Sequence, residues 1–480
     1  MLDDRTALSE MLKYYYTVEG VQNLLERGDP RLKYFDKVIT VEGKKTPFAV
    51  SDTFGFCSAA YTKVKANALS DEGAVVFNVD AGQLFTSFQI SADEIQAIKS
   101  EKGGFQSIPD FKLNACIEGL SRGLAASLDG RGYGEIGVFN DAATFVANTA
   151  IDISLPSDVL IKIPTKGKIL LKPAVSTAEN DANVITLTIV SVNEDTVTVK
   201  PAASSTVTAG SHLIICIEGS MIGSAPRRPM GLGGWIPAVN ARTGATWTNF
   251  IDDQFFGVHR SAHRHVYGNF IAAKTDTETK QTTIERAAIV ARRMGLVSGV
   301  LFMNDEDYFE YVQELEAKNQ YYTITNTAEG RNAAFGYEKV AGKMVGTSIS
   351  EIVDSPYVVK QQFWLLDPKV VVMFEYSNSY DYATKKVKGS NEAGKALTTD
   401  LENESPVKEN ALIHGLNIDY LFDIHSGEPT DNGATTLVDM HFFGSWAVIN
   451  PSLVTTGFFA KAKATPDGTP DFSGIVSYYA

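Results

Sequence analysis

Residues 103–137 read GGFQSIPDFKLNACIEGLSRGLAASLDGRGYGEIG and predict one long helix that ends in a glycine-rich turn. Pro109 suits the first helical position, because the N–H that it lacks would have no partner there. The apolar positions fall on one helical stripe: Leu113, Cys116, Ile117, Leu120, Leu124 and Leu128. The run from Asp129 to Gly134 is typical of a helix C-terminus and turn. We therefore expect a helix from about residue 109 to about residue 128.

Upstream of this helix the sequence alternates between short strands and turns. The expected strands are Lys37–Val41, Ala74–Val79 and Leu84–Ile90.

Residues 1–38 favour a mainly helical arm, in which Leu8, Met11, Leu12 and Tyr15 recur at helical spacing until Asp29-Pro30. An extended arm and loop cannot bury their own apolar residues, so we expect neighbouring subunits to cover several of them: Phe48, Phe54, Phe56, Tyr61, Val75, Val76 and Phe77.

Downstream of the helix, residues 151–217 change to period-two alternation rich in valine, isoleucine and threonine. Val184–Val192, the turn at residues 193–195 and Thr196–Lys200 predict a hairpin, and His212–Cys216 predicts a further strand. This pattern indicates a small antiparallel β module inserted between two α/β parts.

The C-terminal half predicts helices and buried strands. The expected helices are Thr283–Arg293, capped by Thr282 or Thr283, and Asp305–Lys318; the expected strands are Gly299–Met303, Val370–Glu375 and Asp439–Asn450. Residues 218–280 are rich in loops, and residues 377–410 are polar and charged enough to form an exposed loop. The fold class is therefore α+β.

The composition is that of a globular protein. The 480 residues are 44% hydrophobic and 21% charged, and the formal net charge is -14. An acidic chain argues against a sequence-reading nucleic-acid binder, which needs a basic face to neutralise phosphates. Three widely separated cysteines, Cys57, Cys116 and Cys216, argue against a disulfide framework and favour folding in a reducing cytoplasm. The N-terminus has no signal-peptide pattern, and no apolar run is long enough to span a membrane.

The residues with chemical potential match no enzyme signature. His259, His263 and His265 lie close together, but their spacing matches no structural zinc pattern, and Arg260 and Arg264 would repel a cation. The glycine-rich run at residues 129–137 lacks the preceding strand and following helix of a phosphate loop. The acidic pairs Asp252-Asp253 and Asp305/Asp307 are common surface features. We expect no catalytic residue, no metal site and no cofactor.

The order of several stretches resembles the major capsid proteins of tailed bacteriophages, with the Hong Kong 97-type fold. Residues 55–98 resemble the segment that leads through the family's extended loop (E-loop), and residues 103–137 resemble its spine helix. ITLTIVSVNEDTVTVKPA at 185–202 and AGSHLIIC at 209–216 resemble a β insertion found in one branch, and GLGGWIP at 231–237 its linking motif. Residues 282–315 resemble the helix–strand–helix before the axial domain, and residues 440–457 the returning C-terminal strand.

This resemblance implies a division of the chain. It comprises an N-terminal arm (1–38), an E-loop region (39–90), the spine helix with the peripheral domain (91–150), the β insertion (151–217), a linking segment with the peripheral domain (218–280), an axial domain (281–435, with the exposed loop 377–410) and a returning strand (436–480). Many copies would assemble as hexamers and pentamers into an icosahedral shell around double-stranded DNA. A separate scaffolding protein, a portal, and decoration or vertex proteins are the implied partners, and no membrane is involved.

The expected functional residues are inter-subunit contacts. On the E-loop they are Phe54, Phe56, Lys63 and Lys65; on the basic run they are Arg260, His263, Arg264 and His265, which would face acidic groups of an adjacent subunit. Local packing or plain solvation is the alternative for each. An encapsulin-like cargo shell of the same fold is the alternative function, and a soluble metal-dependent hydrolase that uses the histidine cluster is a more distant one.

The histidine cluster generates a first prediction. If it is part of the packing of a shell protein, elemental analysis of the purified protein should find no bound metal, because the flanking arginines disfavour a cation. Zinc in a stoichiometric amount would overturn this interpretation and favour the hydrolase.

Overall fold

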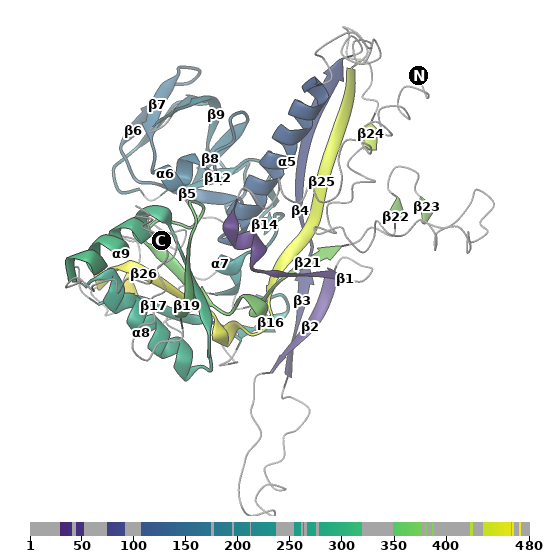
Figure 1. Ribbon diagram of the computed structural model, residues 1–480. Coiled ribbons are helices and arrows are strands. Elements are labelled where there is room, and N and C mark those ends of the chain that lie inside the picture. Colours follow the sequence, from purple (N-terminus) through teal and green to yellow (C-terminus); the bar gives the residue numbers. More distant parts are fainter. Residues whose placement is uncertain are drawn as a thin grey trace, which may run out of the picture.

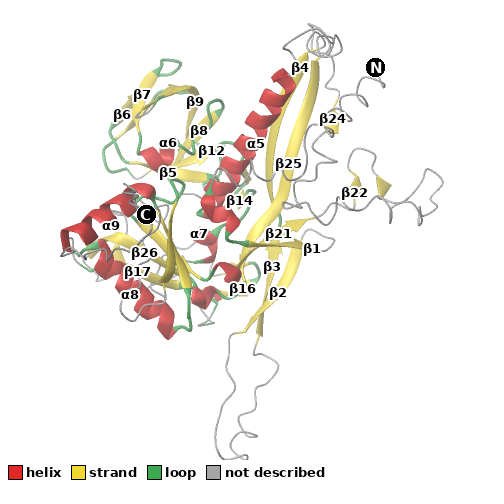
Figure 2. Ribbon diagram, viewed as in Figure 1, coloured by secondary structure: helices red, strands yellow, loops and turns green. Residues whose placement is uncertain are grey.

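The computed structural model describes residues 29–40, 45–51, 74–91, 107–173, 177–193, 196–211, 213–236, 254–260, 263, 266–274, 278–318, 349–376, 380–381, 386–387, 423–425, 435–461, 463–464 and 470–471. Within these ranges the chain forms three modules: a long sheet with one long helix, a β insertion and an α/β module (Figures 1 and 2). No helix in the described part of the chain is long and apolar enough to cross a membrane.

The long helix α5 (Ser107–Leu128) lies along a ribbon of two long antiparallel strands, β4 (Gly82–Ser91) and β25 (Thr435–Val448) (Figure 1). The expected apolar stripe is buried where the structure describes its side chains, at Cys116, Leu120, Leu124 and Leu128. A Cβ on Gly123 would lie 3.7 Å from a methyl group of Leu84, so the helix packs closely on β4. The helix predicted from its spacing is confirmed.

Chain segments far apart in the sequence complete the long sheet. Its strand order is β1 (Asp36–Thr40), β21 (Val371–Tyr376), β25 and β24 (Asp423–His425), and β4 pairs with β25. β1 runs parallel to β21, whereas β21 and β25 are antiparallel. β21, whose residues fall within the range 281–435 predicted for the axial domain, lies in the sheet that supports the long helix.

The hairpin of β2 (Lys45–Ser51) and β3 (Ala74–Asp80) corrects the expected burial of the E-loop region. Val75 and Phe77 are buried and Phe48 is half-buried, all within the core of their own subunit, because alternate residues of both strands face that core. Val76, on the opposite face, is half exposed. Phe54, Phe56 and Tyr61 lie outside the described residues.

The β insertion is larger than its predicted range. Its six-stranded sheet has the order β5 (Glu135–Phe139), β12 (Leu213–Ile217), β8 (Lys168–Lys172), β9 (Ile185–Val192), β10 (Thr196–Pro201) and β7 (Ile151–Ser154). The module therefore begins at Glu135 and not at residue 151, since β5 follows the glycine-rich turn directly and supplies the sheet's edge. The predicted hairpin is confirmed as β9 and β10.

The remaining elements of the insertion and of the linking segment are short. They are β6 (Ala143–Phe145) paired with β11 (Ser205–Val207), α6 (Ser157–Leu160), β13 (Met221–Ile222) paired with β14 (Ala225–Pro226), α7 (Leu232–Trp235), and β15 (Gln254–Phe255) paired with β16 (Val258–His259).

The α/β module has a five-stranded sheet in the order β17 (Asn269–Ala273), β26 (Thr455–Lys461), β20 (Gln362–Leu366), β18 (Gly299–Met303) and β19 (Ile349–Asp354). Helices α8 (Lys280–Arg293) and α9 (Asp305–Lys318) pack on it through a shared core. β17 and β26, whose residues fall outside the range 281–435 predicted for the axial domain, both pair within this sheet.

The N-terminus of α8 differs from the prediction. The helix begins at Lys280, three residues early, because the Thr279 side chain is the cap and accepts a hydrogen bond from the Thr282 N–H. α9 and β18 have the predicted bounds.

The other elements are the single turns η1 (Pro30–Lys33), η7 (Pro368–Val370) and η8 (Pro451–Leu453) and the two-residue ribbons β22 (Tyr380–Asp381) with β23 (Lys386–Val387) and β27 (Lys463–Ala464) with β28 (Pro470–Asp471). Apart from β22 and β23, the predicted exposed loop 377–410 lies outside the described residues.

The packing of α5 on the ribbon generates the second prediction. Leu124→Ala should destabilise the unassembled subunit by about 2–5 kcal/mol, because the Leu124 side chain is buried and its loss leaves a cavity. The measurement is urea unfolding followed by circular dichroism. Arg122→Ala on the same helix is the control: Arg122 forms an exposed pair with Glu118, and its removal should cost less than about 1 kcal/mol. Equal losses for the two variants would contradict the packing described here.

Candidate functional site

The structure describes two of the eight residues expected to form inter-subunit contacts. Phe54, Phe56, Lys63 and Lys65 lie outside the described residues, as do Arg264 and His265. Arg260 and His263 are described, and His263 is half-buried.

Arg260 lies inside its own subunit, which corrects the expectation that it faces acidic groups of a neighbour. Its guanidinium donates hydrogen bonds to the carbonyl oxygens of Gly234 at 2.8 Å and Trp235 at 3.1 Å, and it lies 4.1 Å from the centre of the Phe255 ring. Only 1% of Arg260 is exposed. The aromatic face and the two carbonyl oxygens both stabilise the positive charge of the buried guanidinium.

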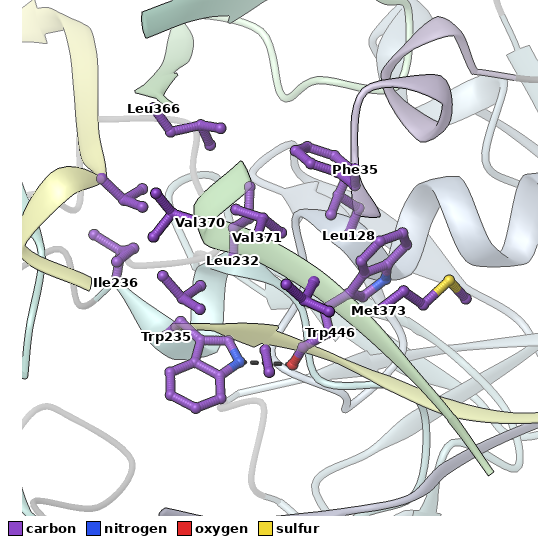
Figure 3. Packing of buried hydrophobic residues seen from close by; sticks show 14 of the residues in the cluster. Phe35, Leu128, Leu232, Trp235, Ile236, Leu366, Val370, Val371, Met373 and Trp446 are labelled. Atoms are coloured by element: carbon purple, nitrogen blue, oxygen red, sulfur yellow. Dashed lines mark hydrogen bonds between the residues drawn. The ribbon is translucent and has the colours of Figure 1, made fainter. Parts of the chain in front are cut away.

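Arg260 supports an aromatic cluster in which the linking segment meets the hairpin and the long sheet. The Trp235 ring lies 5.6 Å from Phe48, 5.2 Å from Phe77 and 5.0 Å from Phe255, measured between ring centres. Its Nε1–H donates to the carbonyl of Trp446 in β25 at 2.8 Å (Figure 3). Trp235 therefore joins the β2–β3 hairpin to the long sheet, beside the direct contact of Phe48 with Phe374 of β21 at 5.9 Å.

The linking segment also packs directly on the end of α5. A Cβ at Gly231 would lie 2.0 Å from the carbonyl oxygen of Ser127, so no other residue fits there without a shift of the backbone. The Gly231 N–H donates to the carbonyl of Gly130 at 3.2 Å. This close approach explains why glycines are abundant both in the turn after the helix and in the linking segment.

The glycine-rich turn holds a carboxylate of its own chain. The N–H groups of Arg131 and Tyr133 donate to the carboxylate of Glu135, the latter at 3.1 Å. Burial raises the pKa of Glu135, and the charge of Arg131 and these hydrogen bonds oppose that shift. Because Glu135 occupies the position that an anion would take, the turn is not a phosphate loop.

A buried junction of charged side chains lies at the end of α5. Arg31 donates to both oxygens of Asp129 at 2.8 Å, and its Nε donates to Asp29 at 2.9 Å. Burial by itself would lower the pKa of Arg31, but the charges of Asp129 and Asp29 raise it above its usual value. Asp29 also accepts a hydrogen bond at 3.0 Å from the Ser355 hydroxyl, which follows β19.

A second polar contact, exposed to solvent, joins the insertion to the α/β module. The Glu306 carboxylate in α9 accepts hydrogen bonds from the Lys360 ammonium and from the Ser157 hydroxyl of α6. The Lys360 N–H donates to Asp158 at 3.3 Å. Hydrogen bonds from Lys360 and Ser157 lower the pKa of Glu306. We call Ser157, Glu306 and Lys360 the surface latch.

The sequence did not reveal the junction or the latch. Asp129 directly follows the apolar stripe, and Arg31 lies in the predicted arm, but nothing in the sequence pairs residues 98 positions apart. At the end of the predicted arm, Leu32 and Phe35 belong to the main hydrophobic core of the chain.

The described residues include no group of histidine, cysteine and carboxylate side chains that could hold a metal ion. Of the cysteines, Cys116 and Cys216 are buried and form no disulfide, while Cys57 lies outside the described residues. Burial raises the pKa of Cys216 to about 12, so its thiol is protonated at neutral pH and is a poor nucleophile.

Comparisons with known proteins find relatives only among solved structures. No family model and no curated protein matches the chain. The capsid of a native GTA particle is 10% identical, with 90% of each chain covered and a TM-score of 0.38. The capsid of cyanophage A-1(L) is 9% identical, covering 90% of this chain and 92% of that chain, with a TM-score of 0.42. A virus-like particle from Pyrococcus furiosus is 7% identical, with 91% and 95% covered and a TM-score of 0.35.

The titles of these similar structures name two capsids and a virus-like particle.

The surface latch generates the third prediction. Because the folded-state pKa of Glu306 is lowered, its contribution to stability is present above the unfolded pKa of about 4.3 and is lost as pH falls below it. Glu306→Gln should therefore lower the urea midpoint of the unassembled subunit at pH 7 and have less effect at pH 3.

Glu218→Gln is the control for the latch. Glu218 forms an exposed salt bridge with Lys168 of β8. Its removal therefore measures the effect of losing a surface pair that does not connect two modules. If Glu306→Gln lowers the midpoint equally at both pH values, the latch does not act through the carboxylate charge.

Proposed function

We propose that this chain is the major capsid protein of a tailed bacteriophage and assembles into the icosahedral shell that encloses a double-stranded DNA genome. The proposal rests on one observation: α5 and the β4–β25 ribbon form a spine, and the spine and the β2–β3 hairpin both extend beyond the compact modules in different directions (Figure 1). Such extensions leave surfaces that one subunit does not cover, and repeated copies can cover them.

The order of the parts supports the same proposal. An arm, a hairpin, a long helix, a β insertion, a linking segment and an α/β module follow one another as in the Hong Kong 97-type fold that the sequence resembles. The exposed face of the hairpin carries Pro47, Ala49 and Val76, whose side chains are apolar. We propose that this face and the loop beyond it, with Phe54, Phe56, Lys63 and Lys65, contact an adjacent subunit. His263, Arg264 and His265 are proposed contacts of a second interface.

The partners follow from that role. Subunits would gather as hexamers and pentamers, and a separate scaffolding protein, a portal and decoration or vertex proteins would complete the particle. Synthesis and assembly would take place in the bacterial cytoplasm, where the cysteines stay reduced. The net charge of -14 suits a container, because an acidic lining would not bind the DNA phosphates. The role is structural, and catalysis is not part of the proposal.

The fourth prediction tests this function. Purified recombinant or native protein should form angular shells in negative-stain electron microscopy, because the spine and hairpin surfaces are satisfied only in an assembly. Native particles should contain nuclease-resistant DNA. Shells filled with protein would favour the encapsulin-like alternative. A monomer in size-exclusion chromatography at all protein concentrations would contradict a shell role, and hydrolase activity in that monomer would favour the enzyme.

A further inference from the structure

The segment Asp29–Phe35 makes contacts with both of the sheets that meet in the subunit's main core. The Phe35 ring lies 5.7 Å from Phe302 of β18, in the α/β module, and 5.7 Å from Trp446 of β25, in the long sheet. Tyr34 lies 5.7 Å from Phe302. An aromatic side chain that touches two sheets at once fills the space between them.

The polar side chains of the same segment repeat this double contact. Arg31 binds Asp129 at the end of α5, and Asp29 accepts the hydroxyl of Ser355, which follows β19 of the α/β module. Arg31 and Asp29 bind each other at 2.7 Å, which makes the path from helix to module continuous. All three charged side chains are at most 1% exposed.

Because the contacts between Asp129, Arg31, Asp29 and Ser355 are buried, they are costly to break. A buried ion pair contributes little net stability, but it is costly to break, because one charge is then left in a low-dielectric interior without a partner. Any rotation of the α/β module against α5 that separates Ser355 from Asp129 must break a buried contact or carry the segment along. The segment therefore restricts the two modules to one arrangement.

We propose that Asp29–Phe35 is a strap that fixes the orientation of the α/β module relative to α5, and thereby the curvature of the shell. The curvature part rests on the proposed function, whereas the strap itself is a property of the single subunit.

The test removes a contact on one side of the junction by mutation and measures hydrogen–deuterium exchange on the other side. Ser355→Ala removes the contact on the module side, and Asp129→Asn weakens the contact on the helix side. Hydrogen–deuterium exchange is measured on the unassembled subunit. We expect Ser355→Ala to speed exchange about fivefold in residues 29–35 and 125–129, the factor that corresponds to one lost hydrogen bond. Asp129→Asn should speed exchange in residues 353–358.

Ser350→Ala is the matched control. Ser350 lies on β19, the strand that Ser355 follows, and its hydroxyl donates to the Gly299 carbonyl at 3.0 Å. The variant therefore also loses one serine hydroxyl hydrogen bond, but not one to the strap. Its effect should stay near residues 299 and 350. If Ser355→Ala also acts only around residue 355, or if Asp129→Asn leaves residues 353–358 unchanged, the strap is refuted.

Electron microscopy of assembled particles tests the link to curvature separately. Ser355→Ala should broaden the distribution of particle diameters, whereas Ser350→Ala should not; equal distributions would refute the curvature part. If the wild-type chain forms no shells at all, the proposed function fails, while the exchange experiment still decides whether the strap exists.

Discussion

The contact between the apolar stripe of α5 and the β4–β25 ribbon is the constraint on which the rest of the subunit depends. A 22-residue helix can remain in water only if its apolar face is covered, and here two strands from opposite ends of the sequence cover it. Because β25 lies some 350 positions after β4 in the chain, this one contact brings the C-terminal region back to the N-terminal third. Every other module is attached to that frame, the insertion through the turn after α5 and the α/β module through β25 and β26.

The attachments share one physical device, which is a buried polar group satisfied by a residue far away in sequence. Trp235 donates to the backbone of β25, and Arg260 donates to the carbonyls of Gly234 and Trp235. Arg31 binds Asp129 at the end of α5 and also Asp29, which accepts the hydroxyl of Ser355. A buried donor without a partner costs about 1–3 kcal/mol, so each of these contacts penalises any arrangement in which the modules separate. In the proposed shell, this property would hold the outer surfaces of each subunit at fixed angles to its neighbours.

Periodicity predicted the local elements well. The stripe of α5, the hairpin of β9 and β10, and the bounds of α9 and β18 follow from patterns within single segments, where the spacing of apolar residues directly reflects burial. Burial by neighbours was predicted wrongly for Phe48, Val75 and Phe77, since a segment judged alone shows apolar residues but not the surface of its own chain that covers them. Arg260 shows the same limit of a segment judged alone: its charge suggested a surface contact, whereas the structure buries it against two backbone carbonyls and the Phe255 ring.

The sequence alone determined the class of elements, their order and the resemblance to a capsid fold, because these depend on spacing and on the succession of motifs along the chain. Tertiary structure alone decided which strands share a sheet, that the insertion begins at Glu135, and that Arg31 meets Asp129. The physical reason is that strand partners and buried ion pairs are chosen by the free energy of the whole core. Contacts between residues 98 or more positions apart leave no periodic signal in a single sequence.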